Sequence, residues 1–246
     1  MIDKNELIFG TRAVIEAIEA GKDIDKILIK RGLQNELSRE LFEALKGHLI
    51  PVQRVPIEKL NRLTTKNHQG VIAFTSAVTY QRVEDLVPML YEEGKNPLFV
   101  MLDGVTDVRN FGGIARSAEC AGAHGLITPL KNSAPVNGDA IRSSAGALNN
   151  IPVCRVGSIR NTLKTLQVEG FQIVAATEKS TKLLYDADFT KPTVIVMGAE
   201  DKGISKEVLK LCDEQLAIPL IVHTESLNVA AAAAIMLFEV VRQRIG

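Results

Sequence analysis

The chain has 246 residues, of which 46% are hydrophobic, 24% charged and 4% aromatic, and this composition excludes a disordered tail, a collagen and a disulfide-rich scaffold. Its 29 Lys and Arg residues balance 29 Asp and Glu residues, which argues against a nucleic-acid binder in which basic charge dominates the whole chain. At roughly 150 residues per domain, the length predicts two domains of unequal size.

Residues 1–76 alternate between helical and strand periodicity and predict a small α/β domain. Leu37, Leu41 and Leu45 recur every four residues, which places them on one face of a helix. Between residues 22 and 68, ten basic side chains stand against six acidic ones. An ordinary solvated surface explains this mild basic excess, and contact with nucleic acid is the alternative. The predicted elements are helix 11–20, strand 25–30, helix 35–46, strand 50–55, helix 57–63 and strand 71–76.

Residues 77–96 differ in composition from the segments on either side. They are polar and charged, they contain Pro88 and Gly94, and Pro97 follows them directly. Proline and glycine interrupt regular structure, so this segment is predicted to be a linker with at most one short helix over 83–92.

Residues 97–246 return to short apolar strands that alternate with helices. This pattern predicts a parallel sheet with helices on both faces, and therefore a second, larger α/β domain. The predicted elements are strand 98–102, helix 111–121, strand 125–128, helix 139–148, strand 152–156, helix 159–168, strand 172–176, strand 193–197, helix 206–211, strand 215–218 and helix 227–242.

Several protein classes lack support in the sequence. The longest apolar run, 229–238, has ten residues, whereas a membrane-spanning helix needs about 20. Residues 1–6 are charged and lack the apolar core of a secretory signal. The cysteines at positions 120, 154 and 212 lie far apart, without a Cys-x-x-Cys motif or clustered histidines. We therefore expect a cytoplasmic protein that binds neither a membrane nor a metal.

The common nucleotide-binding motifs are also missing. Residues 111–116 read Phe-Gly-Gly-Ile-Ala-Arg, which does not have the Gly-x-Gly-x-x-Gly spacing of a dinucleotide site. Gly198 and Gly203 have the spacing of a phosphate loop, but Ile204 and Ser205 stand where that loop requires Lys and Ser or Thr. A Gly-x-Ser-x-Gly nucleophile motif is absent. A redox Rossmann enzyme, an NTPase and a hydrolase are all disfavoured.

Three polar or glycine-containing clusters follow predicted strands, over residues 103–116, 198–203 and 218–228. Ligands of open α/β sheets bind beyond the carboxyl ends of the strands. The three clusters are therefore expected to gather at one edge of the sheet and to form the site.

Together the clusters resemble the signature blocks of the SpoU family of RNA ribose 2′-O-methyltransferases, which belongs to the SPOUT superfamily. The first block reads Asp-Gly-Val-Thr-Asp-Val-Arg-Asn-Phe-Gly-Gly-Ile-Ala-Arg over 103–116, and the second reads Ile-Val-Met-Gly-Ala-Glu-Asp-Lys-Gly-Ile over 195–204. The third combines Ile-Pro-Leu at 218–220 with Ser-Leu-Asn-Val-Ala at 226–230. Segments 8–14 and 67–71 resemble the substrate-recognition domain of members that methylate a guanosine in 23S ribosomal RNA.

The resemblance implies a domain division and a reaction. Residues 1–76 would bind RNA, 77–96 would be the linker, and 97–246 would form a methyltransferase domain with a deep trefoil knot. This domain would bind S-adenosyl-L-methionine, form a homodimer and methylate a guanosine ribose in the peptidyl-transferase region of 23S ribosomal RNA. Two positions depart from the family pattern: Val222 and Asp201 stand where glycine is common, which puts cofactor affinity more in question than identity.

The resemblance also implies roles for nine residues. Asn110, Arg116, Glu200, Ser226 and Asn228 match catalytic positions, and Thr177, Gly198, Ile218 and Leu227 match cofactor positions, with Glu178 a weaker candidate. A free guanidinium has a pKa above about 12 and is a poor base. Arg116 is therefore expected to hold an RNA phosphate and to stabilise the developing alkoxide.

Each of these residues has a simpler explanation as well. Asn110, Ser226 and Asn228 stand at predicted helix starts, where such side chains cap free N–H groups. Glu200 fits a solvated loop, and Ile218 and Leu227 fit an ordinary core. The alanines at 230–234 are better explained by close helix packing than by a site.

Other functions remain open at this point. Transfer RNA is an alternative substrate for the same chemistry. A non-catalytic RNA-binding protein of ribosome assembly is a second alternative, and it is disfavoured because Arg116 and Asn228 are both present.

Overall fold

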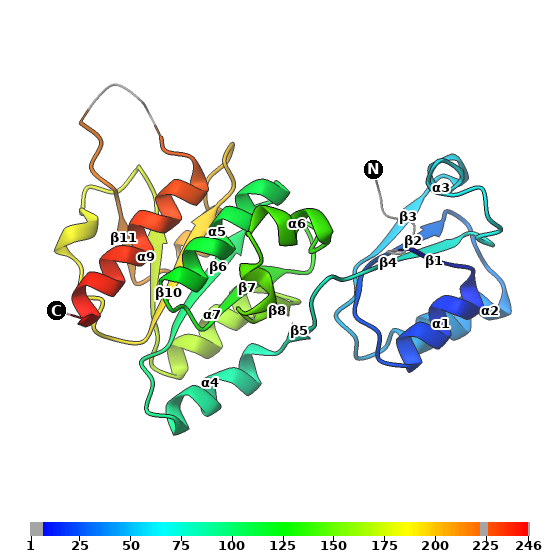
Figure 1. The fold of residues 1–246 in the computed structure, drawn as a ribbon, viewed down its shortest axis with the longest axis horizontal. Coiled ribbons are helices and arrows are strands. Elements are labelled where there is room, and N and C mark those ends of the chain that lie inside the picture. Colours follow the sequence, from blue (N-terminus) through cyan, green and yellow to red (C-terminus); the bar gives the residue numbers. More distant parts are fainter. Residues whose placement is uncertain (1–6, 222–225, 246) are drawn as a thin grey trace. The chain divides into compact units, whose positions relative to one another are not determined.

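The structure is a computed structural model that describes residues 7–221 and 226–245. The chain divides into two compact units, Met1–Thr79 and Tyr80–Gly246, which are described separately below (Figure 1).

The first unit contains a four-stranded mixed sheet in the order β1-β4-β2-β3. Strands β2 and β3 are parallel, whereas β4 is antiparallel to both β1 and β2. Helices α1 and α2 pack on one face of this sheet, where Leu41 is fully buried, and α3 packs on the other face through Leu60. The elements are β1 (Leu7–Phe9), α1 (Thr11–Glu19), β2 (Ile24–Lys30), α2 (Glu36–Ala44), β3 (Val52–Val55), α3 (Ile57–Leu63) and β4 (Val71–Thr75).

The segment 77–96 differs from the expected linker, because most of it belongs to the second unit. Strand β5 (Tyr80–Gln81) pairs with β8 (Val153–Val156), and α4 (Val83–Glu92) packs into the core of that unit. The apolar residues of α4 at positions 83, 86, 87 and 90 have helical spacing, and all four are buried. Their burial outweighs the polar outer face that dominates the composition of the segment.

The second unit contains a seven-stranded sheet in the order β11-β9-β10-β6-β7-β8-β5, in which every pairing is parallel. This confirms the predicted parallel α/β architecture. The other elements are β6 (Leu98–Asp103), α5 (Val108–Cys120), β7 (Gly125–Pro129), α6 (Gly138–Ser143), η2 (Ala147–Asn149), α7 (Ile159–Val168), β9 (Gln172–Ala176), η3 (Leu184–Asp186), β10 (Thr193–Gly198), α8 (Lys206–Leu209), β11 (Glu214–Leu216) and α9 (Val229–Ile245).

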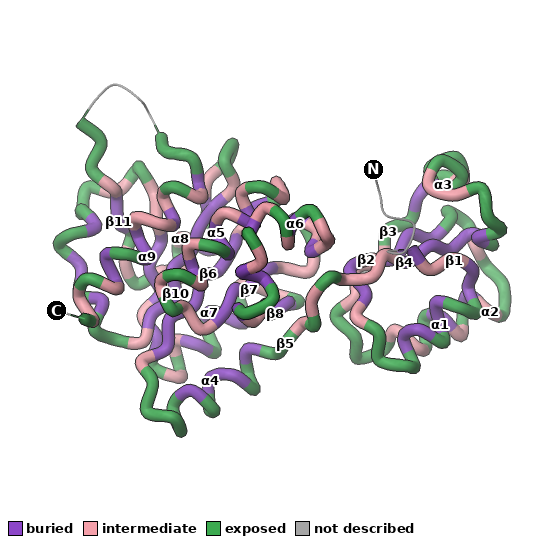
Figure 2. The backbone as a smooth tube through the Cα atoms, in the orientation of Figure 1, coloured by how far each residue is buried: buried purple, intermediate pink, exposed green. Residues whose placement is uncertain are grey.

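The central strands β6 and β10 are buried along nearly their whole length, which explains their unbroken apolar sequences (Figure 2). They pair in register, so that Gly198 lies opposite Asp103 at the carboxyl edge of the sheet. The register therefore brings the first two signature blocks side by side.

Helix α9 packs against α5 through small side chains. A Cβ added to Gly113 would lie 3.0 Å from the Cβ of Ala230, and Ala233 is fully buried. The close helix packing predicted for residues 230–234 is thus confirmed, and it places the start of α9 beside α5.

The helix predicted over 139–148 is shorter in the structure. Helix α6 ends at Ser143, and the chain then takes positive φ angles of 51° at Ala145 and 89° at Gly146 before the short η2 turn. A non-glycine residue in this left-handed region is uncommon, because its Cβ crowds the backbone. Helical periodicity alone does not reveal such a break.

Candidate active site

Asn228, which belongs to the third signature block, is hydrogen-bonded to residues of the other two blocks. Its Nδ2 donates hydrogen bonds to Oδ1 of Asn110 at 3.0 Å and to Oε1 of Glu200 at 2.9 Å. Its Oδ1 accepts from the backbone N–H groups of Ala230 at 3.0 Å and Ala231 at 3.4 Å. The first turn of α9 therefore fixes which way the amide points, and Asn228 is both a helix cap and the centre of a three-residue polar junction.

Asn110 does not cap α5, contrary to its simpler explanation. The helix begins at Val108, and Asp107 is the cap, with Oδ1 accepting from the N–H of Arg109 at 2.8 Å and of Asn110 at 3.0 Å. The pKa of the Asp107 carboxyl is lowered, mainly by the hydrogen bond from the N–H of Asn110; desolvation opposes this effect, and the N–H and side chain of Arg109 add to it. The side chain of Asn110 is thus left to meet Asn228.

Glu200 projects from a tight turn after β10. The N–H of Ala199 donates to the carbonyl of Gly203 at 3.1 Å, and the N–H of Gly203 donates back at 2.8 Å. A Cβ added to Gly198 would lie 2.2 Å from the carbonyl carbon of Gly203, so the turn closes only with glycine at 198. Asp201 is exposed and is not among the residues with positive φ, so this turn accepts Asp where the family favours Gly. The other departure, Val222, lies outside the described residues.

Asp103 supports the same turn, and the sequence analysis missed it. Its Oδ2 accepts from the N–H of Ser205 at 2.8 Å, which ties the end of β6 to the chain that follows Glu200. A carboxylate at the end of a buried strand was the available signal.

A pocket of about 310 Å³ lies at this edge of the sheet. It contains all four residues predicted to bind a cofactor, together with Glu178 and two of the predicted catalytic residues. The wall is mostly apolar on the side of β11 and α9, through Leu216, Ile218 and Val229. The predicted residues that line it are Thr177, Glu178, Gly198, Glu200, Ile218, Ser226 and Leu227.

Arg116 lies elsewhere. It is exposed, it lines a separate cavity formed by α5 and residues 144–150, and no hydrogen bond or ion pair holds its side chain among the described residues. Arg116 follows Asn110 by six residues, and at 3.6 residues per turn the two side chains leave α5 in directions about 120° apart. The expectation that both face one strand end fails for this reason within a single chain.

No cluster of three or more His, Cys, Asp or Glu residues is placed to bind a metal in the described part of the chain. None of the helices over 7–221 and 226–245 is long and apolar enough to cross a membrane.

Comparison with known proteins places this site in a family. Residues 97–238 match the SpoU rRNA Methylase family, and residues 7–81 match the domain described as RNA 2′-O ribose methyltransferase substrate binding. The chain belongs to the SpoU family. The resemblance found in the signature blocks is thereby confirmed, and this SpoU family member is an RNA methyltransferase of the tRNA/rRNA class.

Relatives cover nearly the whole length of the chain. A putative TrmH family tRNA/rRNA methyltransferase of Staphylococcus saprophyticus is 34% identical over 97% of this chain and 96% of its own. The putative TrmH family tRNA/rRNA methyltransferase YacO of Bacillus subtilis is 30% identical over 99% of this chain and 98% of its own.

Solved structures agree with this assignment. The SpoU methyltransferase AviRb from Streptomyces viridochromogenes, crystallised in complex with the cofactor AdoMet, has a TM-score of 0.62 and 29% identity over 97% of this chain and 90% of its own. An AdoMet-bound rRNA methyltransferase from Sinorhizobium meliloti has a TM-score of 0.61 and 26% identity over 96% and 86%.

As a SpoU family member the protein uses S-adenosyl-L-methionine as its methyl donor. The pocket fits such a ligand in its chemistry. Ile218 and Leu227 would offer an apolar wall to the adenine, the close turn at Gly198 would leave room for backbone contact, and Glu178 and Glu200 would add negative charge beside a cationic molecule.

Proposed function

We propose that this SpoU family member methylates the ribose 2′-hydroxyl of a guanosine in the peptidyl-transferase region of 23S ribosomal RNA. The junction of Asn110, Glu200 and Asn228 beside the cofactor pocket is the observation that carries the proposal. It joins polar groups from all three signature blocks beside a pocket that has one apolar wall, where a hydroxyl can be oriented toward a methyl group. With such an RNA substrate, the protein is proposed to act in the cytoplasm.

When bound, S-adenosyl-L-methionine supplies a methyl group already activated by its positive sulfur. A bond forms between this carbon and the ribose 2′-oxygen while the carbon–sulfur bond breaks, and sulfur keeps the electron pair. The residues of the chain must therefore align the hydroxyl, exclude water and favour loss of its proton.

In this proposal, Asn110 and Glu200 orient the ribose, and Asn228 fixes both. Ser226, which is exposed at the pocket rim, contacts the RNA. Arg116 holds the neighbouring phosphate and stabilises the developing alkoxide, and the proton leaves to that phosphate or to water.

The decisive experiment incubates the protein with labelled S-adenosyl-L-methionine and unmodified ribosomal RNA, and then maps the methylated ribose. The same assay with transfer RNA tests the second candidate substrate, which the description of relatives as tRNA/rRNA methyltransferases supports. Methyl transfer to neither RNA would favour a non-catalytic role in ribosome assembly.

The first unit is proposed to recognise the RNA. The family match to a substrate-binding domain over 7–81 and the basic excess between residues 22 and 68 support this assignment. Deleting residues 1–79 should leave the melting temperature of the second unit and its affinity for S-adenosyl-L-methionine intact, while methylation of ribosomal RNA is lost. Equal activity of the truncated and full chains would refute the division of roles.

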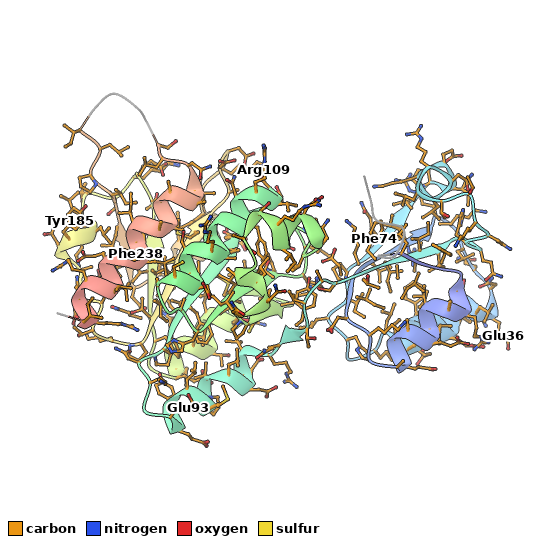
Figure 3. All side chains as sticks on the ribbon, viewed as in Figure 1. Glu36, Phe74, Glu93, Arg109, Tyr185 and Phe238 are labelled. Atoms are coloured by element: carbon orange, nitrogen blue, oxygen red, sulfur yellow. The ribbon has the colours of Figure 1, made fainter. Side chains whose placement is uncertain are left out.

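A homodimer through the second unit is proposed as the active form. Phe238 on α9 is 50% exposed (Figure 3), and Arg116 lies outside the cofactor pocket of its own chain. A second copy would bring Arg116 to that pocket. We also propose that the second unit contains the deep trefoil knot expected from its family.

Complementation tests the shared site. Chains that carry Arg116→Ala and chains that carry Gly198→Ala should each be inactive, yet exchange of subunits should recover about a quarter of wild-type activity, because half of the dimers then hold one complete site of two. Failure to recover activity when native mass spectrometry shows mixed dimers would mean that Arg116 and the pocket act within one chain.

A further inference from the structure

The cavity that contains Arg116 has the size and chemistry of a ligand site. Its volume is about 420 Å³, within the usual range for pockets that hold small molecules. It shares no lining residue with the cofactor pocket. Its polar lining consists of Arg116, Glu119 and Cys120 from α5 and Ser144, Asn149 and Asn150 from the segment after α6.

The walls of this cavity are held firmly together. A Cβ added to Gly112 would lie 2.4 Å from the Cβ of Ser143, so α5 and α6 are in close contact beside the cavity. The hydroxyl of Ser144 donates to the carbonyl of Ile141 at 2.9 Å and accepts from the N–H of Leu148 at 3.3 Å. The segment that presents the two asparagines is therefore fixed before any ligand binds.

Glu119 is positioned within this cavity rather than left free in solvent. Its Oε1 accepts from Nδ2 of Asn150 at 3.2 Å, and the thiol of Cys120 lies 3.9 Å from its Oε2. Each carboxylate oxygen has two lone pairs, so both oxygens can accept a further hydrogen bond. The cavity thus offers a pair of adjacent acceptors, with the unpaired guanidinium of Arg116 in the same lining.

We infer that this cavity is the base subsite for the nucleotide to be methylated and that Glu119 recognises guanine. The inference rests on the proposed function, in which Arg116 lies at the ribose and phosphate of that nucleotide. A base attached to that ribose must lie close to Arg116, and Arg116 lines this cavity.

Hydrogen-bond chemistry selects the base. The Watson–Crick edge of guanine carries two adjacent donors, N1–H and the N2 amino group, which an ionised carboxylate can accept together. Adenine presents one donor beside an acceptor at N1, and that acceptor would face a carboxylate oxygen. Cytosine and uracil likewise lack two adjacent donors. Among the four bases, only guanine satisfies both oxygens of Glu119.

The substitution Glu119→Gln tests this assignment, because a glutamine amide offers one acceptor and one donor, the pattern that matches adenine. On a ribosomal RNA transcript, kcat/KM for the target guanosine should fall by roughly 10- to 100-fold. The same transcript with adenosine at the target should become the better substrate of the variant. Affinity for S-adenosyl-L-methionine should not change, and Glu93→Gln, at an exposed carboxylate outside both cavities, should behave as wild type.

A binding measurement separates this inference from the proposed function. In NMR titrations, wild-type protein should bind guanosine 5′-monophosphate about tenfold more tightly than adenosine 5′-monophosphate, and Glu119→Gln should abolish the preference. Equal binding of the two nucleotides by wild type, or a preference for guanosine that survives the substitution in either assay, would overturn the subsite. A guanine preference that depends on Glu119 in a protein that transfers no methyl group would sink the proposed function and support the subsite.

Discussion

Arg116→Ala is the substitution that separates catalysis from stability most cleanly. The side chain is exposed and has no hydrogen bond or ion pair among the described residues, so its removal costs no folded-state contact of that kind. Exposed substitutions of this sort change stability by about 0.5 kcal/mol or less, and alanine has the highest helix propensity. Urea denaturation should therefore give nearly the wild-type free energy of unfolding.

Methyl transfer should collapse in the same variant. A preorganised charge at a developing oxyanion is typically worth a factor of about one hundred or more in rate. This factor corresponds to about 2.7 kcal/mol in the activation free energy. Single-turnover transfer from labelled S-adenosyl-L-methionine measures the rate. Calorimetry should show unchanged cofactor affinity, since Arg116 does not line the pocket of its own chain and is proposed to contact the RNA rather than the cofactor.

Two further variants make the test specific. Arg109→Ala is the matched control, because Arg109 lies on the same helix with a side chain that is 87% exposed, and it should retain near wild-type activity (Figure 3). Arg116→Lys keeps the charge but loses the planar fork that binds a phosphate through two parallel hydrogen bonds. Substantial activity in Arg116→Lys would favour a simple charge role, and wild-type turnover in Arg116→Ala would refute the assignment.

Three further experiments test the polar junction, the turn after β10 and the burial of the cysteines. Asn228→Ala should lower the free energy of unfolding by about 0.5–2 kcal/mol through loss of the α9 cap, and it should reduce methyl transfer at least about tenfold. Asn228→Asp should restore the cap but not the rate of methyl transfer. Comparable activity in both variants would mean that Asn228 only caps the helix. Gly198→Ala should abolish cofactor binding in calorimetry, because its Cβ would lie 2.2 Å from a backbone carbon of the following turn; wild-type affinity would contradict that geometry. Burial raises the pKa of Cys154 and Cys212 to about 12, so iodoacetamide at pH 8 should modify the exposed Cys120 first, and mass spectrometry should find one adduct on the native protein and three in denaturant.

The position of a pocket at the carboxyl edge of the sheet could be predicted because it follows from a general property of parallel sheets. Polar residues and glycines after strands meet at one edge, and this rule brought Thr177, Gly198 and Ile218 to one pocket from three separate segments. The register of β10 against β6 then determines which residues face each other. The sequence predicts the strands and their direction, whereas the register between neighbouring strands becomes visible only in the structure.

Several elements of the fold were harder to predict from the sequence. Strands β1 and β5 have three and two residues, too few for an alternating pattern. Helix α4 has the right apolar spacing, but its charged outer face and Pro88 resemble a linker in composition. The capping role of Asp107 could have been predicted from the sequence, since Asp is among the preferred residues at a helix start. The helix predicted over 83–92 has the bounds of α4, but its composition did not indicate that it packs into the core of the second unit.

The placement of Arg116 shows that residues of one sequence block do not all lie in one site. Asn110 and Arg116 belong to one signature block and one helix, so a block-based interpretation assigns them to one place. The rotation of an α-helix sends them to different faces, one toward Glu200 and Asn228 and the other toward Glu119 and residues 144–150. A reaction that needs both faces must span the helix or use two copies of the chain. The proposed dimer and base subsite are consistent with the second route: the RNA would be held by one subunit at Arg116 while the methyl group is presented by the pocket of the other.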